Sequence, residues 1–283
     1  DLHILKGDVP TCEPGRVLGH EGVGIVEEVG TAVGSFKAGD HVLISCITSC
    51  ARCEYCRRGM YSHCTDGGWA LGNTIDGTQA EFVRIPHADN SLHPVPAGAD
   101  EEALVMLSDI LPTGYECGVL NGTAQFYAPA LIIMIDLDDN RLAVARRFGA
   151  THTFNSSRDA VVRLVRDLTD GKGVDAAIEA VGVPATFSLC EELVAPGGVI
   201  ANVGVHGTKV DLHLEKLWSH NITITTRLVD TVSTPMLLKT VEAKRLQPGQ
   251  LITHHFALDD ILAAYETFSN AAASQALKVV IAA

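Results

Sequence analysis

The sequence has 283 residues, of which 47% are hydrophobic and 19% are charged, and its formal net charge is -13 at pH 7. This size and apolar content suffice for two domains with cores of their own. The acidic balance disfavours nucleic acid or an anionic membrane surface as a partner, because both attract basic surfaces. The apolar runs before Asp136 and up to Val205 are shorter than the ~20 residues of a membrane span. We therefore expect a small-molecule ligand, no nucleic acid and no membrane.

The first part of the chain, residues 16–84, is dense in Gly and Val. Its short alternating segments GIVEEVG, DHVLISC and AEFVRIP are separated by Gly, Pro and Asp. Such segments predict the strands of a small β-rich, barrel-like domain. The opening residues DLHILKGDVP resemble the middle of a loop, so we expect a segment upstream of Asp1.

Four cysteines follow in the stretch SCARCEYCRRGMYSHC, at the spacing C-x2-C-x2-C-x7-C. Thiolates at this spacing can close tetrahedrally around one metal ion, which predicts a structural zinc site. An iron–sulfur cluster is the first alternative, because a ferredoxin run begins in the same way, although no proline follows the last cysteine here. Unliganded or disulfide-bonded thiols are the second. The four residues are Cys50, Cys53, Cys56 and Cys64.

The remaining cysteines are scattered along the chain, and we expect them to be small core residues. They are Cys12, Cys46, Cys117 and Cys190. Half of the eight cysteines lie in one metal-like cluster and no signal peptide is recognisable, which suits a reducing cytoplasm better than a disulfide scaffold. The predicted location is cytoplasmic.

After about Pro112, apolar segments alternate with helical ones, from LIIMID through DDNRLAVARRFGA and AVVRLVRDLTD to VIANVGV. This alternation predicts a parallel α/β sheet. From about Gln247, the segment LITHHFALDDILAAYETFSN predicts an amphipathic helix and the final ALKVVIAA predicts a strand.

Several motifs together resemble the zinc-dependent medium-chain alcohol dehydrogenases, in their bacterial NAD-dependent branch. They are GHEGVGIVEEVG, GDHV, the four-cysteine stretch, DGTQAEF and SDILPTGYE. The resemblance covers essentially the whole chain. It implies a GroES-like β-barrel catalytic domain over residues 1–112 with a zinc lobe at 46–66, a Rossmann-type cofactor domain over 113–246, and a return to the catalytic domain over 247–283.

The resemblance also implies a catalytic zinc besides the structural one. His20 and Asp109 match two of its ligands, and Glu21 matches a carboxylate that can approach the metal. Asp1 matches the carboxylate that orients the ligand histidine, and His3 matches the histidine that ends a proton relay. Without this context, a histidine beside a glutamate is usually a surface pair.

In the sheet domain, the resemblance implies an NAD site. Asp136 matches the acidic residue that hydrogen-bonds the adenosine ribose and selects NAD over its 2′-phosphorylated relative, and Arg141 matches a basic residue on the same ribose. For Arg141, a solvated helix face is an equal alternative. Further cofactor-facing positions are Thr113, Val181, Gly182, Val203, Gly204 and Val205. Lys278 matches a terminal basic residue that reaches the pyrophosphate.

The chain departs from the family at the phosphate loop. No G-x-G-x-x-G occurs, and only TAQFYAPALIIMI stands between Gly122 and Asp136, so the first strand and the glycine loop of the cofactor domain are expected to be missing. Two functions follow. The first is hydride transfer between NAD and a small primary or secondary alcohol, in a homo-oligomer for which the family implies a tetramer. The second is a zinc-stabilised, catalytically impaired remnant that binds no dinucleotide.

Overall fold

The structure, a computed structural model, describes residues 1–123 and 129–283. The chain forms two compact units, which we describe separately. Unit 1 comprises Asp1–Glu116, Leu228–Asn270 and Ala276–Ala283. Unit 2 comprises Cys117–Arg227 and Ala271–Gln275.

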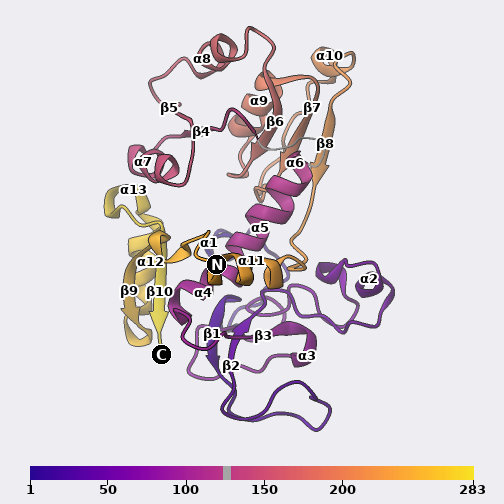
Figure 1. The fold of residues 1–283 in the computed structure, drawn as a ribbon, viewed down its shortest axis with the longest axis vertical. Coiled ribbons are helices and arrows are strands. Elements are labelled where there is room, and N and C mark those ends of the chain that lie inside the picture. The colour runs from indigo at the N-terminus through magenta and orange to yellow at the C-terminus, as the bar shows by residue number, and fades with distance from the viewer. Residues whose placement is uncertain (124–128) are drawn as a thin grey trace. The chain divides into compact units, whose positions relative to one another are not determined.

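Unit 1 is built on an antiparallel sheet in the order β1-β2-β3 (Figure 1). Its strands are β1 (Gly22–Ile25), β2 (His41–Ile44) and β3 (Leu92–Pro94). Gly22 is opposite Ile44, and Ile44 is opposite Leu92 on its other side. One face of this sheet buries Val42, Ile44, Leu71 and Leu92, which form a single core cluster.

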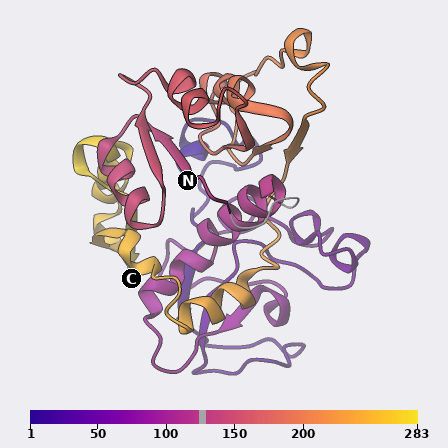
Figure 2. The same cartoon turned by 45° about the horizontal axis from the view of Figure 1, so that its top comes forward.

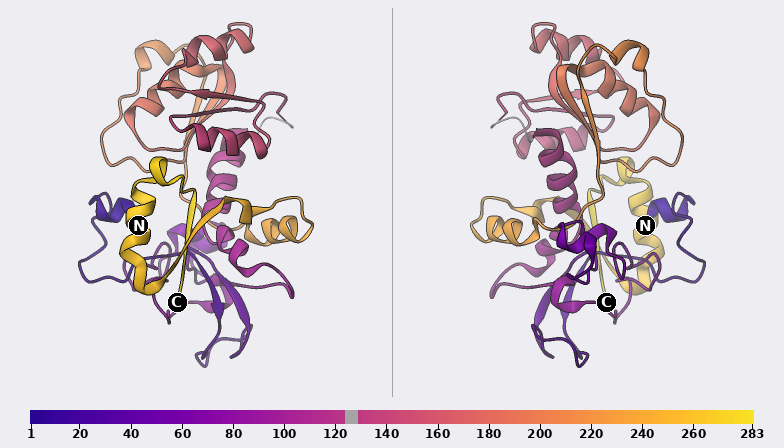
Figure 3. Two further views of the ribbon diagram at one scale, coloured as in Figure 1. Left: turned by 90° about the vertical axis from the view of Figure 1, so that its left-hand side faces the viewer. Right: turned by 90° about the vertical axis from the view of Figure 1, so that its right-hand side faces the viewer.

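A second part of unit 1 comes from the C-terminal residues. The strands β9 (Ile252–Ala257) and β10 (Lys278–Ala282) pair in parallel, and α12 (Ile261–Ser269) packs beside them (Figures 1 and 3). The other helices of unit 1 are short. They are α1 (Leu2–Leu5), α2 (Glu54–Arg57), α3 (Ala88–Ser91), α4 (Glu101–Leu104), α5 (Ile110–Thr113) and α11 (Thr234–Glu242), with 3-10 turns at Tyr61–His63, Val105–Leu107, Pro248–Leu251 and Leu258–Asp260.

Unit 2 holds a parallel sheet in two pieces. The strands β4 (Ile133–Asp136) and β5 (His152–Asn155) form one piece, and β6 (Val174–Glu179), β7 (Val194–Asn202) and β8 (Thr223–Thr226) form the other. The pair β4–β5 packs against α7 (Asp139–Arg147), as Figure 2 shows. The remaining helices are α6 (Asn121–Thr123), α8 (Val161–Leu168), α9 (Pro184–Leu193), α10 (Leu214–Leu217) and α13 (Ala271–Ser274).

The two pieces of the sheet share their helices. Ile133 and Ile135 of β4 and Val174 of β6 pack against one cluster formed by Val161 and Val165 of α8 and Leu193 of α9. Among the described residues, no strand joins β4 to β6 by hydrogen bonds. The expected junction of the missing glycine loop coincides with residues 124–128, which lie outside the described part of the chain.

Three local predictions need correction. Residues 80–86 are irregular instead of a strand, because they pair with no neighbouring backbone and contribute only Val83 and Ile85 to the core. The segment predicted as a helix from residue 251 begins with β9, whose exposure alternates residue by residue, and the helix starts only at Ile261.

The third correction concerns the domain boundary. Residues 228–246, assigned from the sequence to the cofactor domain, belong to unit 1. Leu237 and Leu238 of α11 are buried there against Leu43, Leu104 and Leu107. The chain therefore returns to unit 1 before α11, because the apolar face of this helix is buried in the core of that unit.

One stretch, Glu101–Leu120, is long and apolar enough to cross a membrane when judged by length and composition alone, which the sequence analysis did not anticipate. Half of its most apolar window is buried inside the protein. It combines α4, a 3-10 turn, α5 and a π-helical segment at Gly114–Leu120, and Leu104, Met106 and Leu107 are core residues. Its apolar side chains thus serve the core.

Candidate metal and cofactor sites

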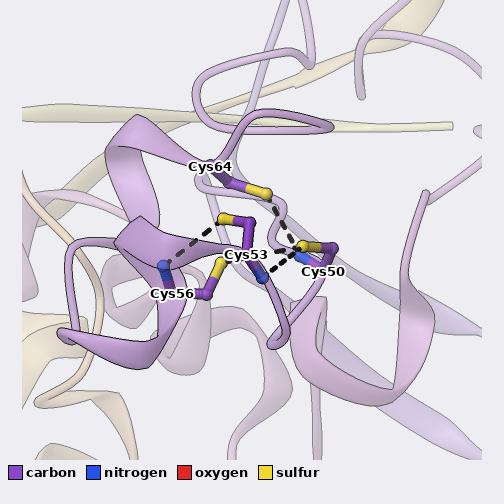
Figure 4. Close-up of side chains that lie close together, drawn as sticks. All are labelled: Cys50, Cys53, Cys56 and Cys64. Carbon is purple, nitrogen blue, oxygen red and sulfur yellow. Dashed lines mark hydrogen bonds between the residues drawn. The ribbon is translucent and has the colours of Figure 1, made fainter.

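The four cysteines of the lobe converge on one point (Figure 4). Their sulfur atoms all lie within 4.8 Å of one another, and the sulfurs of Cys50 and Cys56 are 4.0 Å apart. Four thiolates at ~2.3 Å from a zinc ion stand about 3.8 Å apart, so the cluster fits that ion closely. All four cysteines are free thiols, which removes the disulfide alternative from this structure.

Backbone amides of the lobe point at these sulfurs. The amide of Cys53 donates to the sulfur of Cys50, and the amide of Cys56 donates to the sulfur of Cys53. The bond from the Cys56 amide is the main cause that lowers the pKa of Cys53 to about 6, whereas burial raises the pKa of Cys56 to about 12. Amide donors favour thiolates and are typical of a metal lobe.

A second constellation in unit 1 joins His20 and Asp109. The Nε2 atom of His20 lies 3.0 Å from Oδ2 of Asp109, and Thr113 donates its hydroxyl to the other carboxylate oxygen. Both side chains are partly exposed, at 17% and 27%. Burial acts to raise the pKa of Asp109, but the hydrogen bonds from His20 and Thr113 outweigh it and lower that pKa to about 2.

Two buried polar atoms beside this pair lack a hydrogen-bond partner. They are Nδ1 of His20 and Oε1 of Glu21. Buried polar atoms are normally paired, and unpaired ones at one place are typical of a functional site. Nε2 of His20 and Oδ2 of Asp109, which lie 3.0 Å apart, are donor types that zinc binds, so these two residues could supply two of its ligands.

Glu21 is held from the other side by Lys278. Its Oε2 atom forms an ion pair with the ammonium group of Lys278 on β10, and the two side chains are 24% and 13% exposed. The sequence had assigned Glu21 to the metal and Lys278 to a phosphate. The structure instead brings the two residues together.

Two of the expected catalytic residues lie differently from the expectation. The carboxylate of Asp1 accepts hydrogen bonds from the amide of Gly19 and the side chain of Gln79, and Nδ1 of His20 is left without a partner. His3 is 41% exposed and its ring pairs with Asp8 at 3.0 Å. The carboxylate of Asp1 therefore binds these amide groups and not the imidazole that it was expected to orient.

Cys46 belongs to this region and was not predicted there. It is 2% exposed, and its amide donates to the carbonyl of Ser108, next to Asp109. Burial raises the pKa of its thiol well above the usual value, and the negative charges of Asp109 and Glu21 add to this effect. In the sequence, the only sign of this position was that Ser45 and Cys46 directly follow the apolar segment HVLI.

In unit 2, the carboxyl end of β4 carries the expected ribose-binding pair. Oδ2 of Asp136 lies 3.8 Å from a guanidinium nitrogen of Arg141 on α7, and Oδ1 accepts the amide of Asp138. The two side chains are 26% and 45% exposed. They are thus open to a ligand at the edge of the sheet.

The expected cofactor loops meet at the carboxyl ends of β6 and β7. The amides of Val203 and Gly204 donate to the carbonyl of Glu179. A side chain at Gly182 would come within 2.2 Å of the carbonyl of Val205, so only glycine fits, and its φ of +85° is also in the region that glycine favours. Val181 and Val205 remain more than half exposed.

Glu179 organises both loops and was missed in the sequence analysis. Its side chain is buried, and Oε1 accepts from the amides of Val181 and Gly182 and from the hydroxyl of Thr186. The ring of His206 approaches its other oxygen at 3.3 Å. An acidic residue at the end of the buried strand VDAAIE was the signal available.

Comparison with known proteins agrees with this arrangement. Residues 1–97 match the alcohol dehydrogenase GroES-like domain, and residues 126–242 match the zinc-binding dehydrogenase family. An alcohol dehydrogenase of Cupriavidus necator is 34% identical over 95% of this chain and 85% of its own length. The chain belongs to the zinc-binding alcohol dehydrogenase family. Membership confirms the predicted fold class, a GroES-like domain with a Rossmann-type parallel sheet.

Two further proteins extend the comparison. The apo structure of zinc-dependent alcohol dehydrogenase 2 from Streptococcus pneumoniae is 52% identical and superposes with a TM-score of 0.93, over 99% of this chain and 86% of that one. The NADP-dependent isopropanol dehydrogenase of Thermoanaerobacter brockii is 32% identical over 90% of this chain and 81% of its own length. The family is thus one of zinc-dependent enzymes that use nicotinamide cofactors.

The alignment with the Cupriavidus protein also bears on the missing loop. It extends over 314 positions, more than the 283 residues of this chain, so it includes positions that have no counterpart here. This agrees with an internal loss such as the one expected between Gly122 and Asp136, and with the sheet of unit 2 being in two pieces.

Proposed function

We propose that this alcohol dehydrogenase relative oxidises small primary or secondary alcohols with NAD, and that His20 and Asp109 hold its catalytic zinc. The observation that carries the proposal is the pairing of Nε2 of His20 with Asp109 at 3.0 Å, next to unpartnered buried atoms of His20 and Glu21. A zinc ion held there would supply Lewis acidity, which would lower the pKa of an alcohol hydroxyl.

The residues of the chain have separate tasks in this proposal. Thr113 holds one oxygen of Asp109 and so keeps the other aimed at His20. Lys278 neutralises Glu21 and keeps a second negative charge from crowding the pair. In this proposal, His3, which is 41% exposed and paired with Asp8, would pass the proton to water.

NAD as the cofactor is supported by Asp136. A carboxylate at the end of β4 can accept hydrogen bonds from a ribose and repels a 2′-phosphate. Arg141 works in the opposite direction, because a guanidinium group favours a phosphate. Because the ion pair with Arg141 offsets the charge of Asp136, the proposed preference for NAD rests on the hydrogen bonds that the carboxylate would accept from the ribose.

The test of this function is a direct titration of the zinc-loaded protein with NADH and NADPH, followed by fluorescence, with alcohol-dependent NAD reduction as a second measurement. We expect NADH to bind at micromolar concentration and more tightly than NADPH. Asp136→Ala should reduce or reverse that preference, whereas Asp167→Ala, at an exposed position of α8, should not. Tighter binding of NADPH by the unchanged protein would contradict the choice of NAD.

His20→Ala provides the matching test of the metal site. The variant should bind one zinc equivalent less and keep its fold, because His20 is partly exposed and contacts only Asp109 and Trp69 among the described ring and side-chain partners. His41→Ala, at an exposed pair with Glu101, is the control and should retain all zinc. Equal zinc content in the two variants would refute the site.

The second candidate is a zinc-stabilised protein that binds no dinucleotide. It is favoured by the two-piece sheet of unit 2, because the strand and loop that carry pyrophosphate amides have no counterpart among the described residues. No fluorescence change at saturating NADH, with the zinc content intact, would select it. A homotetramer in the cytoplasm remains part of the first proposal, and sedimentation of the purified protein tests the assembly.

A further inference from the structure

The segment Asp230–Ser233 of unit 1 contacts both the cysteine lobe and the helix that carries Asp109. It does so through two buried carboxylates, Asp230 at 3% exposure and Glu116 at none. Neither residue belongs to a predicted site. Buried carboxylates are costly unless hydrogen bonds satisfy them, so their partners indicate what they are for.

On one side, Asp230 binds the cysteine lobe. Its Oδ1 accepts from the amide of Ser62 at 2.9 Å and from the hydroxyl of Ser62 at 2.6 Å. Ser62 lies in the 3-10 turn between Cys56 and Cys64. The carboxylate therefore grips the loop that carries the last cysteine of the lobe.

On the other side, the same segment binds Glu116. The amide of Asp230 donates to Oε2 at 2.9 Å, and Ser233 donates both its amide and its hydroxyl to Oε1, at 2.8 and 2.7 Å. Glu116 lies in the π-helical segment, seven residues after Asp109, and Thr113 lies between them with its hydroxyl on Asp109. The position of Asp109 thus depends on where Glu116 is anchored.

The backbone between the two carboxylates is strained and tightly held. Thr231 has a φ of 60°, which is unusual for a β-branched residue. Its hydroxyl bonds to the carbonyl of Asp230 and to the hydroxyl of Ser45, at the end of β2. A strained turn persists only where its surroundings fix it, and such turns concentrate at functional sites.

We propose that Asp230 and Glu116 are positioning residues that couple the metal-loaded cysteine lobe to the His20–Asp109 site. A metal ion bound by the four thiols fixes Ser62, and Ser62 in turn holds the carboxylate of Asp230. Because the amide of Asp230 binds Glu116, this keeps the first turn of α5 and the carboxylate of Asp109 in place. This inference rests on the proposed function, since it requires a metal at His20 and Asp109.

The experiment measures cobalt(II) affinity of the whole protein by absorption, because cobalt bound by thiolates absorbs differently from cobalt bound by imidazole and carboxylate. Asp230→Ala should weaken binding at the His20–Asp109 site about tenfold, as indirect ligand supports commonly do, while the thiolate signal persists. Asp230→Asn, which keeps an oxygen acceptor for Ser62, should restore most of the affinity. Glu191→Gln, at a buried carboxylate of unit 2, is the control.

The coupling itself is tested by combining substitutions. Cys53→Ser, which breaks the lobe, should weaken the His20–Asp109 site by a similar factor in the unchanged background and cause little further loss in Asp230→Ala. If Cys53→Ser does not fold, Ser62→Ala takes its place, because it keeps all four thiols. If the two substitutions lowered the cobalt affinity of the His20–Asp109 site independently, so that their factors multiplied in the double variant, the coupling would be refuted. An unchanged affinity in Asp230→Ala would refute it as well.

A different result would fail the proposed function instead. If His20→Ala leaves the cobalt spectrum of the protein unchanged, no metal binds at His20 and Asp109. That result would refute both the proposed metal site at His20 and Asp109 and the coupling, because the coupling requires that site. The affinity measurements and the spectrum therefore separate the two failures.

Discussion

Glu179 is the residue on which the loops of unit 2 depend most. Three donors share its Oε1 atom, and two loop amides bond to its carbonyl. Removing the carboxylate takes the acceptor from these three donors. Among them the amide of Gly182 makes a buried hydrogen bond, and a buried donor without a partner costs ~1–3 kcal/mol.

This arrangement predicts a difference between two substitutions. Glu179→Ala should destabilise the protein by ~2–3 kcal/mol, whereas Glu179→Gln, whose carbonyl can take over the three hydrogen bonds, should cost about 1 kcal/mol or less. Urea unfolding measures both. Similar losses in the two variants would mean that negative charge, and not the acceptor, is what the site needs.

Gly182 offers a second test at a single position. Gly182→Ala adds a methyl group 2.2 Å from the carbonyl of Val205, whereas Gly171 has a similar φ of +79° and open space around it. Gly171→Ala should therefore report only the backbone strain, ~1–2 kcal/mol. Unfolding of Gly182→Ala should cost clearly more, and equal values would show that the loop at Val205 can move aside.

At the scale of elements, the cysteine lobe is a short loop with little apolar material, and α2 within it has only four residues. The four thiols and the metal ion that they can bind therefore stabilise the lobe in place of an apolar core. Cys53→Ser should thus destabilise the lobe without changing any chemical step directly.

We expect the thermal midpoint of Cys53→Ser to fall by about 6–12 °C, the shift that ~3 kcal/mol produces in a domain of this size. Its zinc content should fall by one equivalent. Differential scanning calorimetry with zinc analysis measures both, and Cys12→Ser is the matched control because Cys12 lies outside the lobe and its thiol donates to the carbonyl of Gly72. An unchanged midpoint and zinc content would refute the structural zinc.

The sequence predicted some elements well for physical reasons. The cysteine lobe is local, so spacing alone brings its four ligands together. The runs LIIMID and VIANVGV contain β4 and β7, both strands of parallel pairs, and the second half of β7 is buried as a continuously apolar run predicts. The strand β9 was predicted as part of a helix because its alternating pattern is followed almost directly by the helical pattern of α12. Only the pairing of β9 with β10 distinguishes the strand from the helix.

Several of the residues that sequence analysis missed have partners that are remote in the sequence. Glu116 bonds to residues more than a hundred positions later, and Ser62 and Asp230 are similarly far apart. A lone acidic residue in an apolar helix carries no sign of such a partner. His20 and Asp109 were found only because their motifs resemble a family.

For the whole molecule, two metal sites of different chemistry predict two steps of metal removal. The proposed His20–Asp109 site offers one nitrogen and one oxygen donor, whereas the lobe offers four thiolates. A strong chelator should remove one zinc equivalent quickly and the second slowly, and only the second step should lower the thermal midpoint. Zinc release and thermal unfolding, sampled from one reaction, measure this, and a single phase would contradict two distinct sites.

The two-piece sheet of unit 2 has a consequence for how this protein behaves in concentrated solution. In the part of the chain that the structure describes, β4 pairs only with β5 and β6 only with β7, so each of these strands has one edge that no described strand covers. Open edges can capture a strand from another chain, and natural sheets usually shield them. Met134 and Ile178, on these strands, are both more than 40% exposed, so we expect the protein to self-associate through added strands as its concentration rises.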